Sequence, residues 1–110
     1  AEEQVSLARA ARDRRRQTEN DLRREWAKAR DRWTGAREET ELNRAAVQER
    51  TELARLTYDA YRAGRTPFLE VQSANLQLLD AQTALARSRL AELTQLAVLE
   101  SLSSKGSVSP

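Results

Sequence analysis

Helix-breaking residues are nearly absent from this 110-residue chain, and their absence constrains the fold more than any other feature. Gly35 is the only glycine or proline within residues 2–63, and residues 68–103 contain neither. The whole chain has only 3 Gly and 2 Pro, which is too few turn residues for a strand-rich fold. Strong helix formers such as Ala, Leu, Arg and Glu dominate instead. We therefore expect an all-α protein built from two long helices.

Three boundary signals coincide in the short segment that separates the two predicted helices. Gly64 suits the left-handed position just past a helix end, Thr66 can serve as an N-cap, and Pro67 fits the first helical position. The predicted fold is a long antiparallel α-helical hairpin of coiled-coil type. It consists of a first helix over residues 1–63, a tight turn over 64–67, a returning helix over 68–103 and a frayed tail over 104–110.

Two stripes with heptad spacing run along the second predicted helix. We call the first the leucine stripe; it consists of Leu69, Gln72, Leu76, Leu79, Thr83, Ala86, Leu90, Leu93 and Ala97. We call the second the mixed stripe; it consists of Val71, Ala74, Leu78, Ala81, Leu85 and Ser88. Their centres lie more than about 100° apart on a helical wheel. A helix with two separated stripes packs between two neighbours, as in a helical barrel or a multi-helix bundle.

The first predicted helix is poorer in apolar side chains. A set of residues recurs every seven positions, namely Trp26, Trp33, Thr40, Val47, Ala54 and Tyr61. Charged side chains of both signs dominate residues 9–41, which favours exposed pairs along a helix. We expect the N-terminal half to be solvated or weakly packed. We interpret Trp26 and Trp33 as packing residues rather than as a ligand site.

Several classes of function are excluded or disfavoured by composition. The chain has no Cys, His or Met, which removes thiol nucleophiles, His-based acid–base chemistry and soft-metal ligands. The basic run Arg14, Arg15 and Arg16 has acidic neighbours and no interleaved aromatics, so it is typical of a solvated helix face rather than a nucleic-acid site. We expect no enzymatic activity, no cofactor or metal, and no nucleic-acid partner. Because the chain starts at Ala1, we expect a processed or excised piece.

The turn and the segment after it resemble a known family. The stretch Tyr-Arg-Ala-Gly-Arg-Thr-Pro-Phe-Leu-Glu-Val-Gln-Ser-Ala at residues 61–74 is similar to the "YxxG, then (F/Y)L-(E/D)-V-L-x-A" signature of the outer-membrane efflux protein family. The run Leu-Gln-Leu-Leu-Asp-Ala-Gln-Thr-Ala-Leu-Ala at residues 76–86 is similar to that family's "xxLLxAQxxLA" run. This family comprises the TolC-like outer-membrane factors, including heavy-metal efflux channels. The resemblance covers roughly residues 54–102.

The resemblance implies that the chain is a fragment of a periplasmic α-barrel. Members of the family form homotrimers with a β-barrel in the outer membrane and a long helical duct in the periplasm. The turn would lie at the periplasmic entrance and contact the adaptor (membrane fusion) protein, which connects the duct to an inner-membrane pump. The implied adaptor-contact residues are Tyr61, Arg62, Gly64, Arg65, Thr66 and Pro67, the implied gating residues are Arg65, Glu70 and Ser73, and the packing seams contain Leu69, Leu76, Leu79, Leu90, Leu93, Val71, Leu78 and Leu85.

Other interpretations stay open from the sequence. The tip residues can serve turn chemistry alone, and the charges around them can simply be solvated. The chain as a whole can be a free-standing structural coiled-coil hairpin that mediates oligomerisation. A helical rod that binds RNA or DNA ranks last among these hypotheses.

Overall fold

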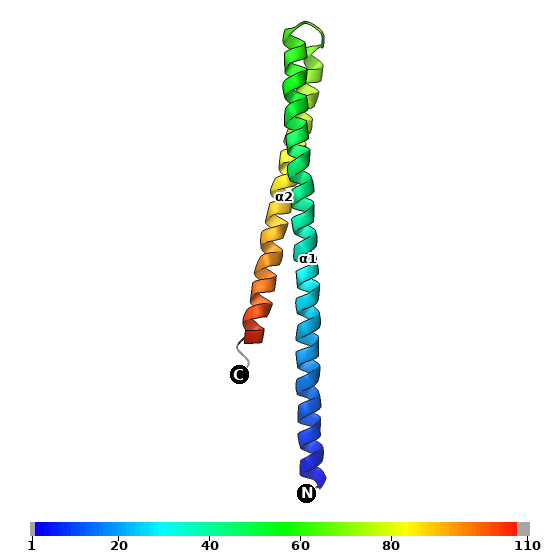
Figure 1. The fold of residues 1–110 in the computed structure, drawn as a ribbon, viewed down its shortest axis with the longest axis vertical. Helices are drawn as coiled ribbons and strands as arrows, with labels where there is room; N and C mark the ends of the chain where they lie inside the picture. The colour runs from blue at the N-terminus through cyan, green and yellow to red at the C-terminus, as the bar shows by residue number, and fades with distance from the viewer. Residues whose placement is uncertain (1, 108–110) are drawn as a thin grey trace. The chain divides into compact units, whose positions relative to one another are not determined.

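The chain folds into two α-helices joined by one short turn, as Figure 1 shows. The computed structural model describes residues 2–107. Helix α1 spans Glu2–Arg62 and helix α2 spans Phe68–Ser107, with 61 and 40 residues. Within residues 2–107 there is no strand. The predicted all-α helical hairpin is confirmed.

Both helix lengths follow from the scarcity of breakers, and one helix end differs from the prediction. Helix α1 passes through Gly35 without interruption, because a single glycine costs only about 1 kcal/mol in a helix. Helix α2 continues past Ser103, so the predicted frayed tail is wrong for residues 104–107. No proline interrupts this stretch, and Lys105 in the last turn interacts favourably with the helix dipole. Residues 108–110 of the predicted tail, like Ala1, lie outside the described residues.

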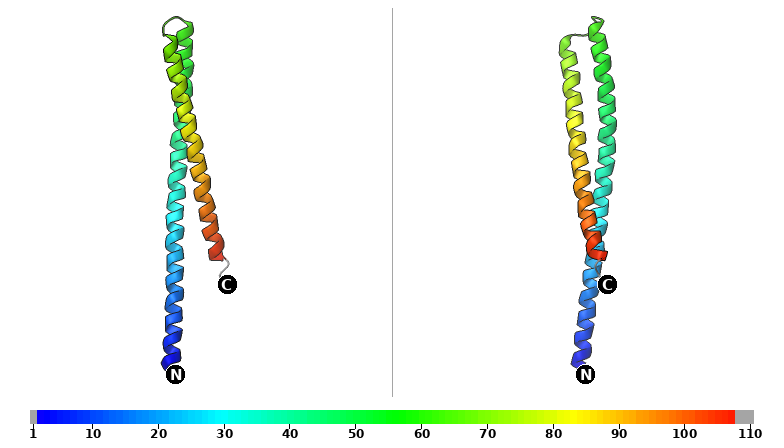
Figure 2. Two further views of the ribbon diagram at one scale, coloured as in Figure 1. Left: turned by 180° about the vertical axis from the view of Figure 1, so that it is seen from behind. Right: turned by 90° about the vertical axis from the view of Figure 1, so that its left-hand side faces the viewer.

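The chain divides into two units, and one of them, Thr34–Thr94, contains the turn and the parts of both helices next to it. Figure 2 shows these two helix segments running side by side below the turn. The mixed stripe of α2 faces α1 here: Val71, Ala74, Leu85 and Ser88 are all buried. On α1 the most deeply buried residue of this unit is Thr40. Ala74, Ser88 and Thr40 are small, which lets the two helices approach closely at these positions. The mixed stripe is therefore the seam of the hairpin.

Hydrogen bonds satisfy the polar groups in and beside this seam. The hydroxyl of Thr40 donates to the Ala36 carbonyl at 2.9 Å, and that of Ser88 donates to the Leu85 carbonyl at 2.9 Å. Because each hydroxyl is paired within its own helix, its burial leaves no unmet hydrogen bond. Hydrogen bonds also cross between the helices in this unit: Asn43 Nδ2 donates to the Ala84 carbonyl at 3.4 Å, and Arg50 Nη1 donates to Gln77 Oε1 at 2.6 Å.

The other unit contains the N-terminal part of α1, up to Trp33, and the C-terminal part of α2 from Gln95. Its most deeply buried side chain is Ala29, which is 1% exposed. Trp26 Nε1 donates to Ser103 Oγ at 3.1 Å, and the Arg30 guanidinium lies 5.6 Å from the centre of the Trp26 ring. Residues 2–21 are exposed apart from a half-buried Ala10. The prediction of a solvated N-terminal half is confirmed for these residues.

Candidate functional site

The turn is closed by a complete Schellman motif. Gly64 has a φ of 75°, which is the left-handed conformation that closes a helix. The Gly64 N–H donates to the Tyr61 carbonyl at 2.9 Å, and the Arg65 N–H donates to the Ala60 carbonyl at 2.9 Å. These are the two bonds that define the motif. The predicted conformational role of Gly64 is therefore confirmed.

An aromatic pair spans the turn. The rings of Tyr61 and Phe68 lie with their centres 5.4 Å apart and their planes tilted by 54°, which is a favourable aromatic arrangement. Both side chains remain largely exposed, at 40% and 52%. Phe68 was missing from the residues predicted for the tip. Its position seven residues after Tyr61, on the other side of a Gly–Pro turn, was the available signal.

The polar residues near the turn make local contacts. The Thr66 hydroxyl donates to Glu70 Oε2 at 3.3 Å, and the Glu70 N–H donates to the Pro67 carbonyl at 3.1 Å. Ser73 Oγ accepts a bond from Gln77 Nε2 at 3.4 Å. Among the described residues, no ion pair joins Arg65 to Glu70, and the side chain of Arg65 is exposed. Within one hairpin, the predicted gating residues therefore do not form a single cluster.

The leucine stripe of α2 faces away from α1 in the unit Thr34–Thr94. Its leucines are more than half exposed, with values of 73% at Leu69, 62% at Leu76, 56% at Leu79, 66% at Leu90 and 64% at Leu93. An open apolar groove follows the stripe near the turn; it is lined by Leu69, Gln72, Ser73, Asn75, Leu76 and Leu79. The two stripes predicted from sequence thus differ sharply, because the mixed stripe is buried or half-buried in the hairpin and the leucine stripe is solvent-exposed.

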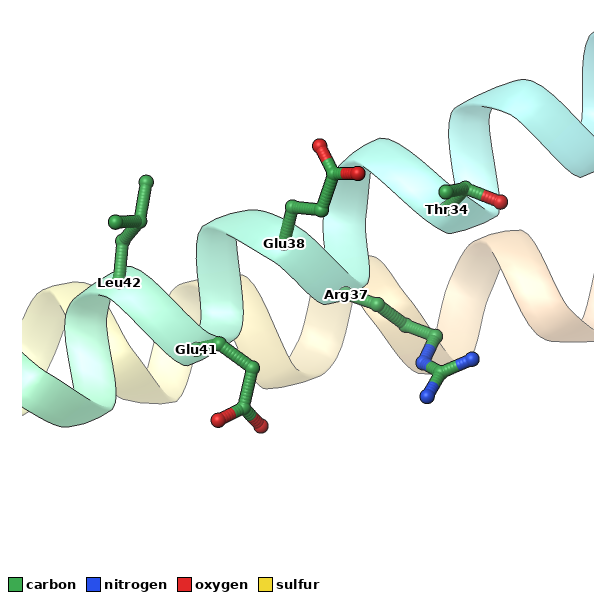
Figure 3. Close-up of a pocket in the computed structure, with 5 residues that line it drawn as sticks. All are labelled: Thr34, Arg37, Glu38, Glu41 and Leu42. Atoms are coloured by element: carbon green, nitrogen blue, oxygen red, sulfur yellow. The ribbon is translucent and has the colours of Figure 1, made fainter.

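A second open groove lies on α1, and Figure 3 shows that its side chains diverge. It is lined by Thr34, Arg37, Glu38, Glu41 and Leu42. Glu38 and Leu42 extend to one side of the helix, whereas Arg37 and Glu41 extend to another. The Arg37 side chain approaches Glu92 of α2 at 4.0 Å, and Glu41 pairs with Arg44 at 3.9 Å. This groove has no set of convergent polar groups of the kind that fixes a small ligand.

The exposed face of α1 carries one perturbed carboxylate. Arg55 donates from Nε to Glu52 Oε2 at 3.1 Å and from Nη1 to Asp59 Oδ2 at 3.2 Å. The hydrogen bond from Arg55 holds the pKa of Glu52 below its ordinary value, and the same bond raises the pKa of Arg55. All three side chains are exposed, so this cluster supports the local helix rather than a reaction.

Residues 2–107 contain no group of three or more Asp, Glu, His or Cys side chains placed to hold a metal ion. Neither α1 nor α2, as far as the structure describes them, has an apolar stretch long enough to cross a membrane.

Comparison of the chain with protein-family models, with curated proteins and with solved structures gave no match.

Proposed function

We propose that this chain is the periplasmic α-hairpin of an outer-membrane efflux channel in a tripartite export system. In this proposal the two helices form part of the duct wall, and the turn faces the periplasmic adaptor protein. The chain acts as a passive conduit, without catalysis or a cofactor. Full-length channels of this kind would assemble as trimers, with this segment in the periplasm.

The exposed leucine stripe is the observation that carries this proposal. A helix in a barrel wall needs one seam to its own hairpin partner and a second seam to the next helix. Helix α2 has its mixed stripe buried against α1, while Leu76 and Leu90 remain 62% and 66% exposed. Isolated leucines on a surface are ordinary, but a row at heptad spacing is typical of a helix–helix interface. The turn motif at residues 61–74, which resembles the efflux family, connects this geometry to a channel.

The turn has properties that suit a docking surface. Its backbone is fixed by the Schellman bonds, so the residues at the tip are held in one conformation. The Tyr61–Phe68 pair offers exposed aromatic surface, and Arg62 and Arg65 offer exposed positive charge beside it. Aromatic and arginine side chains are enriched at protein interfaces. The proposed opening of the channel is a shift of the helices around this fixed tip.

Site-specific photo-crosslinking in the native host tests the proposal. A photoreactive residue at Arg65 should crosslink to the adaptor encoded with the channel, whereas the same residue at Arg12 should not. Both positions are exposed arginines, and only Arg65 lies at the turn. Absence of an adaptor crosslink at both Arg65 and Phe68, with the protein present in the envelope, would overturn the adaptor-facing role.

The alternative is a free-standing structural coiled-coil hairpin, and the leucine stripe favours it as well, because the same row can mediate oligomerisation. The crosslinking experiment separates the two candidates. A structural hairpin should yield crosslinks only between copies of itself, and these should arise at the leucine stripe rather than at the turn.

A further inference from the structure

The leucine stripe has an internal symmetry within residues 69–93. Two leucine pairs, Leu76 with Leu79 and Leu90 with Leu93, flank a centre formed by the small residues Thr83 and Ala86. On both sides of this centre, the leucines lie at the same distances along the sequence. Two copies of α2 laid antiparallel therefore place leucine against leucine, with Thr83 of one copy opposite Ala86 of the other. In this register no leucine of the four faces a polar residue.

Two charged residues, Asp80 and Arg87, lie on the same flank of the stripe. Asp80 directly follows Leu79, and Arg87 directly follows Ala86, so both occupy the flank of the stripe that corresponds to position e of a heptad. Both side chains are exposed, and neither forms an ion pair with another described residue. Charges at such flanking positions determine the partner and orientation of paired helices.

We infer that the free hairpin pairs with a second copy of itself through the leucine stripe of α2, in an antiparallel two-fold dimer. Leu76 lies opposite Leu93 of the second copy, and Leu79 lies opposite Leu90. Because the e positions of two antiparallel helices lie beside each other, Asp80 of each copy lies near Arg87 of the other, which gives two equivalent ion pairs around the two-fold axis. Such an interface is isologous, because the same patch is used on both copies.

The charges select the antiparallel orientation over the parallel one. In a parallel pair, position e of one helix faces the preceding position g of the other. Asp80 would then face Asn75, and Arg87 would face Gln82, so neither charge would meet an opposite charge. The antiparallel arrangement alone pairs both of them.

The rest of the hairpin leaves this interface accessible. Helix α1 covers the mixed stripe, where Ala74 and Leu85 are 6% and 9% exposed, whereas the leucine stripe lies on the far side of α2. Two hairpins therefore meet through α2 while each α1 stays on the outside. This inference concerns the protein in solution and does not depend on the channel proposal.

Sedimentation equilibrium on the 110-residue chain, from micromolar to millimolar concentration, measures the association. We expect a reversible increase from 12.5 kDa to twice that mass. Replacing Leu79 and Leu90 together by Asn should abolish the dimer, with helicity by circular dichroism showing that each hairpin stays folded. The matched control is Leu42→Asn on α1, where a 72% exposed leucine lies outside the stripe and the dimer should persist. A monomer throughout the concentration range would overturn the inference.

Charge reversal tests the register. Asp80→Arg and Arg87→Asp should each weaken the dimer by about tenfold, because each change turns two attractive pairs into repulsive ones. An equimolar mixture of the two single variants should associate at least as well as the unmodified chain, since every facing pair is then of opposite charge. A dimer that neither reversal weakens would overturn the proposed register.

Disulfide trapping tests the orientation, and the chain has no cysteine of its own to interfere. A mixture of Thr83→Cys and Ala86→Cys chains should oxidise mainly to the heterodimer in the antiparallel arrangement. Predominant homodimers of each variant would indicate parallel pairing and would contradict the inference.

Discussion

The two stripes of α2 differ in composition and in environment, although they lie on the same helix with the same heptad spacing. The mixed stripe alternates small residues with Val71, Leu78 and Leu85 and packs against α1, with Val71 only 4% exposed. The leucine stripe contains the larger side chains, yet Leu69 is 73% exposed. The row with more leucines is therefore the one that α1 does not cover. The comparison shows that α2 packs against α1 on one side and exposes a row of leucines on the other.

The largest expected change in stability comes from truncating a leucine of the buried mixed stripe, compared with the same truncation on the leucine stripe. Leu85→Ala, in the buried seam, should lower the free energy of unfolding by about 2 kcal/mol, because burial and packing are both lost. Leu79→Ala, at a site that is 56% exposed, should change it by less than about 0.5 kcal/mol. Urea denaturation followed by circular dichroism, at a concentration where the chain is monomeric, measures both. Equal losses of unfolding free energy in the two variants would contradict the distinction between the stripes.

The turn should be the next most sensitive position, because it brings the mixed stripe against α1. Gly64→Val forces a β-branched residue into a φ of 75° and should cost about 2 kcal/mol. No neighbouring atom lies within 4 Å of an added Cβ, so the cost is backbone strain and not a clash. Thermal unfolding would measure the loss. Gly64→Asn serves as the control, because Asn tolerates the left-handed conformation and should lose much less.

A stabilising change of smaller size is expected at the glycine inside α1. Gly35 has ordinary helical geometry and open space around an added Cβ. Gly35→Ala should therefore raise the free energy of unfolding by about 0.5–1 kcal/mol. It should do so without changing the exposure of either stripe. Destabilisation by this substitution, measured by urea denaturation, would show that α1 is not a continuous helix at this point.

The smallest effect should arise on the exposed face of α1, away from both stripes. The hydrogen bond from Arg55 lowers the pKa of Glu52 below its ordinary value. The stability that this hydrogen bond contributes is therefore fully present above the ordinary pKa of glutamate, and it is lost as the pH falls through the lowered pKa of Glu52. Near neutral pH the unmodified chain should be slightly more helical than the Glu52→Gln variant. In an acid titration followed by circular dichroism, this difference in helicity should disappear as the pH falls through the lowered pKa of Glu52. A difference that stays constant with pH would refute this assignment.

The helices and the turn were predictable because their signals are local. Gly64 and Pro67 identify the turn, and the long intervals without breakers identify the helices. Heptad spacing also predicted both stripes of α2. Spacing alone did not reveal which stripe faces α1, because that choice depends on how closely the two helices approach. The end of α2 at Ser107 was missed because Ser and Lys are weak signals of helix termination.

The tip was predictable as a conformation but not as an arrangement of side chains. The left-handed Gly64 follows from residue type, since few other residues adopt that φ. The contact between Thr66 and Glu70, and the absence of an ion pair between Arg65 and Glu70 among the described residues, depend on side-chain rotamers. Sequence spacing does not specify rotamers.

The most direct test of the two-sided helix compares thiol reactivity at two alanines of α2. Ala74 belongs to the mixed stripe and is 6% exposed, whereas Ala86 belongs to the leucine stripe and is exposed. Each is changed singly to Cys in a chain that has no other cysteine, and modification is followed in dilute, monomeric protein. We predict that Ala86→Cys reacts about as fast as the unfolded chain and that Ala74→Cys reacts much more slowly. Equal rates at the two positions would contradict the account.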